Sequence, residues 1–186
     1  TRVDAMQETL LGRTNKECRQ GKLAEVIEGA DVLIGVSAPG AFTPELIAQM
    51  AKDAIVFSLC NPQPEIGYEE AKAAGVKVVG TGRSDAPNQV NNVSVFPGIF
   101  RGAIDVRARR INDAMKLAAV YAIADLVKEE ELREDYVVPN AFDKRVAPAV
   151  ARAVAQAAME TGVARVKMDP AEVERRAAKR IAHGIQ

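Results

Sequence analysis

An α/β fold, consisting of a parallel sheet followed by C-terminal helices, is predicted by two observations. Three short apolar segments begin roughly 20–25 residues apart, with a helical pattern in each gap, and this is the spacing of βαβ units. After about residue 99, apolar residues recur with helical periodicity into the C-terminal region. The first observation indicates parallel strands, and the second indicates a helical segment behind them.

The first strand is predicted over Asp31–Ser37, an apolar segment with turn residues on both sides, as expected for a buried strand. A helix should follow it, because Thr43 is a suitable N-cap, Pro44 fits the first helical position and Glu45 complements the helix dipole. This helix is predicted to run to about Lys52.

The second and third strands are predicted over Ala54–Leu59 and Val76–Gly80. A helix over Glu65–Ala74 should join them, with Gly75 ending it, because glycine readily takes the left-handed backbone of a helix C-terminus. Right-handed crossovers then bring the carboxyl ends of the strands to one edge of the sheet, where open α/β sheets bind their ligands.

Polar residues follow the strands at that edge. Ser37, Asn61 and Thr81 occupy these positions, and each leads into a turn that contains proline or glycine. The loop over Thr81–Asn92 is therefore predicted to leave the sheet on its ligand-binding side.

The rest of the chain is predicted to be mainly helical. An N-terminal helix over Asp4–Gln20 is weakened by Gly12 and Thr14. A loop is expected over Val137–Asp143. The other predicted helices are Leu23–Ile27, Ile99–Arg109, Asn112–Lys128, Pro148–Thr161 and Pro170–His183, with Asn112 and Asp169 as N-caps.

Composition indicates one globular domain, with room for an appendage, in 186 residues. Because 25 basic side chains balance 25 acidic ones, neither nucleic acid nor a membrane surface is expected as a partner. No apolar run approaches the ~20 residues of a membrane span, and no signal peptide is visible. Two cysteines, Cys18 and Cys60, without disulfide or zinc spacing fit a cytoplasmic location. The chain begins at Thr1 without an initiator methionine, so an upstream segment is expected.

The loop and apolar block over Thr81–Arg101 are unusually rich in side chains that suit a polar ligand. Each of its asparagines alone could cap a following helix, but the adjacent pair Asn91 and Asn92 exceeds what capping requires. A neutral amide donates to a carboxylate and accepts from a hydroxyl or carboxamide, which suits a 2-hydroxy acid beside a nicotinamide. Arg83 and Asp85 are expected to pair and stiffen the loop, with an anion site at Arg83 as the alternative.

Three further positions near the sheet edge each have two interpretations. Asn61 precedes a proline, which favours an extended backbone that directs the amide over the edge, but the amide could equally satisfy its own turn. Glu65 is interpreted as a charge at a helix N-terminus in preference to a ligand. The turn of Gly35, Val36 and Ser37 would let a nucleotide approach the backbone, although it is not a dinucleotide fingerprint.

No residue of this chain stands out as a catalytic acid, base or nucleophile. The one histidine, His183, belongs to a charged C-terminal helix. Cys60 has no positive neighbour to activate its thiol, so a small buried side chain is expected there. Neither a Walker loop nor a metal cluster of recognised spacing occurs. The sequence therefore predicts binding residues without catalytic residues and without metal ligands.

Four motifs, in order, closely resemble the bacterial malic enzymes. Their separations match as well, and the similarity extends from about Gly21 to about Gly162. The motifs are Glu28-Gly-Ala-Asp-Val-Leu-Ile-Gly-Val-Ser, Asn61-Pro-Gln-Pro-Glu-Ile, Thr81-Gly-Arg-Ser-Asp-Ala-Pro-Asn-Gln-Val-Asn-Asn-Val and Phe96-Pro-Gly-Ile-Phe-Arg-Gly-Ala-Ile-Asp-Val.

This resemblance implies oxidative decarboxylation of malate to pyruvate and carbon dioxide, with NAD or NADP and with Mg²⁺ or Mn²⁺. It implies that Asn61 and Asn92 bind malate. The residues that it places along the cofactor are Gly35, Val36, Ser37, Asn61 and Asn91.

The resemblance also implies what this chain lacks. The family's catalytic tyrosine and lysine, its acidic metal ligands and its glycine-rich dinucleotide loop lie upstream and have no counterpart here. We therefore expect an incomplete Rossmann-like sheet, with residues 1–110 as the C-terminal part of an NAD(P)-binding domain and residues 111–186 as a helical segment that packs on the rest of the enzyme. The missing N-terminal part would cover the exposed sheet edge, and a homo-oligomer is expected. The alternative is a non-catalytic nucleotide-binding or assembly module on the same scaffold.

Overall fold

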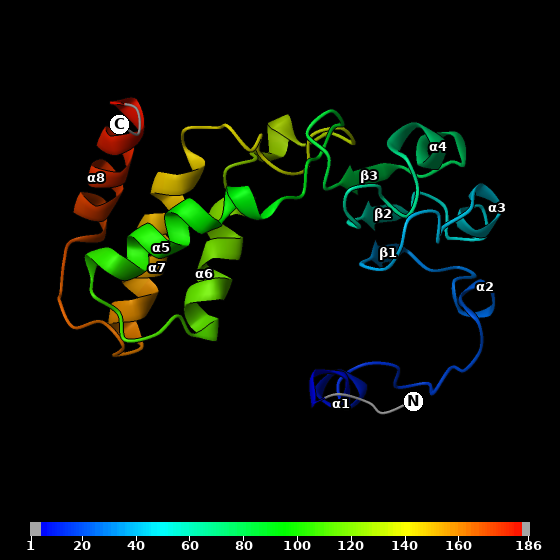
Figure 1. The fold of residues 1–186 in the computed structure, drawn as a ribbon, viewed down its shortest axis with the longest axis horizontal. Helices are drawn as coiled ribbons and strands as arrows, with labels where there is room; N and C mark the ends of the chain where they lie inside the picture. Colours follow the sequence, from blue (N-terminus) through cyan, green and yellow to red (C-terminus); the bar gives the residue numbers. More distant parts are fainter. Residues whose placement is uncertain (1–4, 184–186) are drawn as a thin grey trace.

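The computed structural model describes residues 5–183, which form a sheet half and a helical half joined by two connecting segments (Figure 1). The sheet half contains three parallel strands in the order β1-β2-β3, namely β1 (Val32–Gly35), β2 (Ile55–Ser58) and β3 (Val78–Thr81). Their register places Val32 beside Ile55 and Ile55 beside Val78. The predicted α/β class and the parallel order of the strands are confirmed.

Helices cover only one face of this sheet. Alternate residues such as Val56 and Val79 point to that face and pack with Ile47 of α3 (Pro44–Ile47) and Ala71 of α4 (Tyr68–Ala73). On the opposite face of β1, Val32 and Ile34 are 50% and 59% exposed. The sheet of the described residues therefore has a free edge and an uncovered apolar face, as an incomplete sheet should.

Both helices of the sheet half are shorter than predicted. Thr43 does cap α3, since its hydroxyl accepts from the Leu46 N–H at 3.3 Å, but α3 ends at Ile47 and not near Lys52. The helix predicted from Glu65 begins three residues later, at Tyr68, because Glu65 takes part in a buried hydrogen-bond network at the strand ends.

The N-terminal segment extends away from the sheet half, so that its first helix lies apart from both halves in Figure 1 while its second helix lies beside the sheet half. It contains α1 (Ala5–Leu11) and α2 (Leu23–Val26), and every side chain from residue 8 to residue 25 is exposed. The prediction of one helix over Asp4–Gln20 was wrong in its extent, because the observed helix ends before Gly12. Asp4, where the predicted helix begins, lies outside the described residues.

The helical half is organised around α7 (Val146–Glu160), which is buried along most of its length and packs against the other three helices. Its central residues Val150 and Val154 are fully buried. A Cβ added at Gly102 would lie 2.5 Å from the Ala151 carbonyl oxygen, so glycine allows the close crossing with α7. The three partner helices are α5 (Phe96–Asp105), α6 (Asp113–Ala124) and α8 (Pro170–Ala182).

The predicted caps of two of these helices are confirmed. The Asn112 side chain accepts from the Met115 N–H, and the Asp169 side chain accepts from the Ala171 N–H, each at 3.0 Å. The boundary after residue 110 stays a prediction; in this structure α5 already packs with the helical half.

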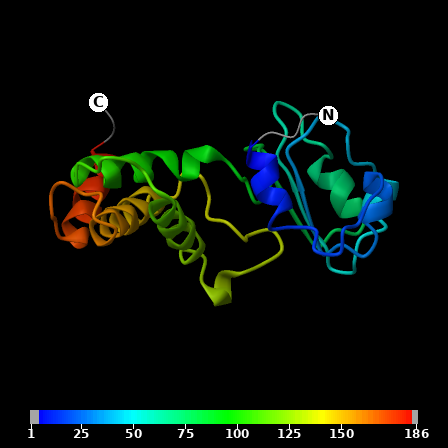
Figure 2. The ribbon, with the colours of Figure 1, turned by 90° about the horizontal axis from the view of Figure 1, so that it is seen from below.

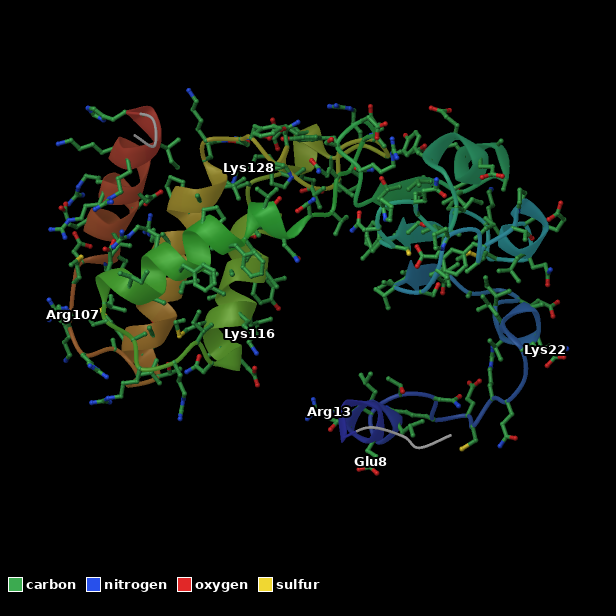
Figure 3. The ribbon with its side chains drawn as sticks, in the orientation of Figure 1. Glu8, Arg13, Lys22, Arg107, Lys116 and Lys128 are labelled. Carbon is green, nitrogen blue, oxygen red and sulfur yellow. The ribbon has the colours of Figure 1, made fainter. Side chains whose placement is uncertain are left out.

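Two segments connect the halves, as Figure 2 shows from below. One runs from β3 to α5 and contains the single-turn helix η1 (Asn92–Ser94). The other leaves the helical half after α6, contacts the sheet half through Glu134 and returns to α7; it contains η2 (Glu129–Glu131). Lys128 lies at the beginning of this second segment, whereas Lys116 lies at the opposite end of α6 (Figure 3). Among the helices of residues 5–183, none combines the length and hydropathy that a membrane span requires.

Candidate functional site

A pocket of about 340 Å³ lies where the sheet half meets the helical half. This volume is within the range of roughly 300–1,000 Å³ that is common for ligand sites. The predicted residues Asn61, Asn91 and Asn92 all line it, although they follow two different strands. The other lining residues are Leu59, Gln89, Val90, Ser94, Val95, Ile123, Val138 and Pro139.

The carboxamides of this pocket differ in how far the protein already uses them. The Asn91 oxygen accepts from the Val93 N–H at 3.0 Å and so caps η1, which leaves its NH₂ group as a donor. The exposed Asn92 side chain makes no hydrogen bond with the described residues and offers both a donor and an acceptor. Capping therefore explains Asn91 in part but does not explain Asn92.

Asn61 lies at the end of β2, against the turn that follows β3. A Cβ added at Gly82 would be 3.3 Å from both the nitrogen and the oxygen of the Asn61 carboxamide. Among the residues that the structure describes, the Asn61 NH₂ group has only a long contact of 3.5 Å with the Leu59 carbonyl oxygen. The glycine thus makes room for an amide that remains available at the strand ends.

The carboxylate of Glu65 joins the ends of β1 and β2 from within the protein. Its Oε1 accepts from the N–H of Ser37 at 2.6 Å and from the Ser37 hydroxyl at 3.2 Å. Its Oε2 accepts from the hydroxyl of Ser58 at 2.9 Å and from the N–H of Cys60 at 3.0 Å. The predicted role of Glu65 as a charge at a helix N-terminus was wrong, because α4 begins only at Tyr68 and the Glu65 side chain is fully buried among these donors.

These contacts keep Glu65 ionised. Burial alone would raise the pKa of the carboxyl group, but the hydrogen bonds from Ser37 and Cys60, with that from Ser58, outweigh it and lower the pKa to about 2. Both donors of Ser37 are directed to Glu65, so toward a ligand the hydroxyl presents its lone pairs. An acceptor at this position suits the NH₂ of a carboxamide or a ribose hydroxyl.

The turn predicted to bind the cofactor lies on the strand next to the pocket and does not line it. Val36 is 80% exposed, whereas Gly35 is buried. A Cβ at Gly35 would meet Phe42 and Glu65 at 2.6 and 2.7 Å, so packing beneath the sheet already requires glycine there. Cofactor binding by Gly35, Val36 and Ser37 stays a prediction.

The expected pairing of Arg83 with Asp85 is present. The Arg83 Nε donates to Asp85 at 2.7 Å, and a terminal nitrogen of Arg83 forms a second contact with the same carboxylate. This bidentate pair raises the pKa of Arg83 and lowers the pKa of Asp85, in both cases mainly through their hydrogen bonds. The pair lies on the surface of the loop, outside the lining of this pocket, and its effect on the stiffness of the loop stays a prediction.

The donor set of the pocket is that of a neutral polar site. Its polar side chains are carboxamides and a serine hydroxyl, which fit the carboxylates of a small acid and the carboxamide of a nicotinamide. Across residues 5–183, no group of three or more histidine, cysteine, aspartate or glutamate side chains is placed to hold a metal ion. Metal ligands from outside this chain stay a prediction.

Several features of the site were not predicted from the sequence. Ile123, Val138 and Pro139 reach the pocket from the helical half and carry no polar signal that could have identified them. Asn88, in the middle of the polar loop, does not line the pocket and is instead buried. Its place after Pro87, in the loop between β3 and Asn91, was the only feature of the sequence that could have drawn attention to Asn88.

The fold and the site together define a class of protein. An open parallel α/β sheet with a polar pocket at its strand ends is the arrangement in which nucleotide-binding α/β domains hold their ligands. The family model described as "Malic enzyme, NAD binding domain" matches residues 4–159. The chain belongs to this family.

Known relatives agree with that assignment. The chain is 63% identical, over 166 residues, to the bifunctional malic/malolactic enzyme of Bacillus subtilis, covering 89% of this chain and 40% of that protein. It is 56% identical to the NAD-dependent malic enzyme of Geobacillus stearothermophilus, with 82% and 32% covered. The crystal structure of malic enzyme from Pyrococcus horikoshii matches with a TM-score of 0.86 at 48% identity, covering 94% of this chain and 40% of that one. The chain thus spans less than half the length of these relatives.

Proposed function

We propose that this chain is the cofactor- and malate-binding part of a malic enzyme, which converts malate to pyruvate and carbon dioxide with NAD or NADP and a divalent metal. The observation that carries the proposal is that Asn61, Asn91 and Asn92 meet in one pocket at the strand ends. Membership of the malic enzyme family supplies the identity of the ligands. Relatives named as NAD-dependent and as NADP-dependent both match, so either cofactor is consistent with the proposal.

The carboxamides of the pocket are proposed to bind and orient the substrate. Asn92, whose carboxamide makes no hydrogen bond among the described residues, donates to a malate carboxylate, and Asn61 does the same from the end of β2. Asn91 has its NH₂ group left for the carboxamide oxygen of the cofactor. The chemistry that NAD or NADP supplies when bound is acceptance of a hydride from the hydroxyl-bearing carbon of malate.

Uncharged amides cannot accept or release a proton near neutral pH, so these residues contribute geometry and not acid–base chemistry. The proton-transfer groups and the ligands of Mg²⁺ or Mn²⁺ are therefore assigned to the N-terminal part of the enzyme. The relatives are longer than this chain, which covers 40% of the Bacillus subtilis protein, and this extra length is consistent with such a part.

The uncovered apolar surfaces are proposed to contact the rest of the enzyme. One is the free face of β1, which carries Val32 and Ile34. Another lies on α5, where Phe96 and Phe100 stack with ring centroids 5.6 Å apart and both side chains are about half exposed. Such surfaces are normally covered by another part of the protein or by a subunit. We further propose that the complete enzyme is a homo-oligomer located in the cytoplasm.

Kinetics of the complete enzyme that contains this chain test the proposal. The Asn92→Ala substitution should lower kcat/KM for malate by about tenfold or more, because it removes a hydrogen bond to a charged group. The matched control is Gln49→Ala, since Gln49 is an exposed carboxamide that donates to the Glu45 carbonyl oxygen, away from the pocket.

The outcomes separate the candidate functions. Malate-dependent reduction of NAD or NADP that falls with Asn92→Ala and not with Gln49→Ala supports the proposal. Unchanged kinetics for Asn92→Ala would remove this residue from the site. Binding of NAD or NADP without any turnover of malate would favour the nucleotide-binding module.

A further inference from the structure

Asn88 is a polar side chain that the pocket does not contain and the protein nevertheless buries. It is 5% exposed and lies in the segment that connects β3 with the pocket residues Asn91 and Asn92. Its φ of 52° lies in the left-handed region, which asparagine and glycine tolerate better than other residues. The loop therefore holds this one residue in an uncommon conformation with its side chain directed inward.

The Asn88 carboxamide makes three hydrogen bonds that join distant parts of the chain. Its NH₂ group donates to the carbonyl oxygens of Val79, in β3, at 3.0 Å and of Glu134 at 2.8 Å. Its oxygen accepts from the N–H of Val137 at 2.8 Å. The partners Glu134 and Val137 belong to the second connecting segment, 46 and 49 residues away.

These bonds join the loop that carries Asn91 and Asn92 to the segment that carries Val138 and Pro139. Immediately after Val137, Val138 and Pro139 form the wall on the side of the helical half. On the other side, the Val90 N–H donates to the Thr81 carbonyl oxygen at 2.8 Å, which ties the loop just before Asn91 to the end of β3. Asn88, three residues before Asn91, is thus bonded to β3 and to the segment that leads directly into Val138 and Pro139.

One exposed interaction supports the same attachment. The Lys72 ammonium group, on α4, forms an ion pair with Glu134 at 3.0 Å and also donates to the Lys77 carbonyl oxygen at 2.8 Å. An exposed pair of this kind contributes little by itself. The buried carboxamide of Asn88 is consequently the main polar link between β3 and the segment that carries Val138 and Pro139.

We propose that Asn88 is a positioning residue for malate, because it sets the distance between the Asn91–Asn92 amides and the Val138–Pro139 wall. This inference rests on the proposed function. A positioning role requires more than stability: loss of the carboxamide must change the affinity for malate in protein that is still folded. A purely structural role would reduce stability and leave the KM for malate unchanged.

The test uses Asn88→Gly in the complete enzyme. Glycine accepts the φ of 52°, so the variant removes the three hydrogen bonds without adding backbone strain. The matched control is Asn15→Gly. Asn15 has a φ of 49° and also bonds through its carboxamide, but to the exposed Arg19, four residues away.

Two measurements are made on folded protein. We expect Asn88→Gly to raise the KM for malate by about tenfold, through the loss of pocket geometry, and Asn15→Gly to leave it unchanged. We also expect amide hydrogen exchange in a peptide over residues 133–139 to accelerate by about tenfold or more in Asn88→Gly, with exchange in α7 unchanged. The exchange measurement does not depend on which ligand the pocket binds.

The outcomes distinguish this inference from the proposed function. Absence of malate turnover in the wild-type enzyme overturns the proposed function, and the inference with it. A wild-type enzyme that turns over malate, with an unchanged KM in folded Asn88→Gly, overturns the inference alone. If Asn88→Gly does not yield folded protein, Asn88→Ser decides by the same criterion, because a single hydroxyl cannot donate to both Val79 and Glu134: a raised KM supports the role, and an unchanged KM refutes it.

Discussion

Replacing Glu65 with glutamine tests whether a buried, ionised carboxylate holds the strand ends together. The substitution keeps one oxygen, which can still accept from Ser37, but it turns an NH₂ group toward the Cys60 N–H and the Ser58 hydroxyl. The Ser58 hydroxyl already accepts from the Ile66 N–H at 3.1 Å and has a second lone pair for the new NH₂ group, but the Cys60 N–H then faces a donor and loses its acceptor. A buried donor without a partner costs about 1–3 kcal/mol, and the bonds to a charged acceptor are lost as well. We therefore expect Glu65→Gln to lower the free energy of unfolding by about 2–4 kcal/mol near neutral pH.

The pH dependence follows from the pKa of Glu65. Folding lowers this pKa from its ordinary value of 4.5 to about 2, so the carboxylate stabilises the protein fully above 4.5 and progressively less as pH falls toward 2. At about 1.4 kcal/mol per pH unit, the shift corresponds to at most about 3 kcal/mol. About 2 kcal/mol of this contribution should be lost by about pH 3.

Urea unfolding of the wild-type protein and Glu65→Gln at about pH 7, about pH 5 and about pH 3 measures this difference. The difference in the free energy of unfolding should be largest at about pH 7 and should shrink by about 2 kcal/mol at about pH 3. Glu69→Gln, at an exposed position of α4, is the control and should match the wild-type protein. A difference that is the same at all pH values would refute the reasoning, because the carboxylate would then not be held ionised by these contacts.

Two further predictions concern glycines that allow close approach. Gly82→Ala should raise the KM for malate several-fold with little change in stability, because the added Cβ would lie 3.3 Å from the Asn61 carboxamide and displace it. Steady-state kinetics measures this, and an unchanged KM would argue against Asn61 as a malate ligand. Gly102→Ala should lower the free energy of unfolding by about 1–3 kcal/mol, because its Cβ would lie 2.5 Å from the Ala151 carbonyl oxygen where α5 crosses α7. Urea unfolding measures this, and a variant as stable as the wild-type protein would contradict the close packing of the two helices.

Local patterns in the sequence were sufficient for the sheet and for its ligand-binding edge. Apolar segments, caps and turn residues act over a few positions, so the strands and the caps at Thr43, Asn112 and Asp169 were predicted correctly. The right-handedness of crossovers is a general rule, and together with the order of the strands it is enough to place Asn61 and the Asn91–Asn92 pair at the same edge.

The sequence failed where a residue's role depends on partners far away in the chain. Glu65 has the pattern of a helix-start charge, but its donors come from Ser37, 28 residues earlier, as well as from Ser58 and Cys60. Asn88 has the pattern of a loop amide, yet its partners lie up to 49 residues away. Neither pairing has a local signal, because each is created when separate elements pack together.

Sequence patterns were therefore enough to predict the main elements, the residues at the strand ends and the family to which the chain belongs. Which of the polar residues face the pocket, and which are buried beneath it, depends on how the elements pack together. The physical reason is that propensity and periodicity act on neighbouring residues, whereas a buried polar group is stable only if packing brings it a partner. Asn92 remains available for a ligand because packing within residues 5–183 brings it no hydrogen-bond partner, whereas Asn88 and Glu65 are buried because packing satisfies their hydrogen bonds.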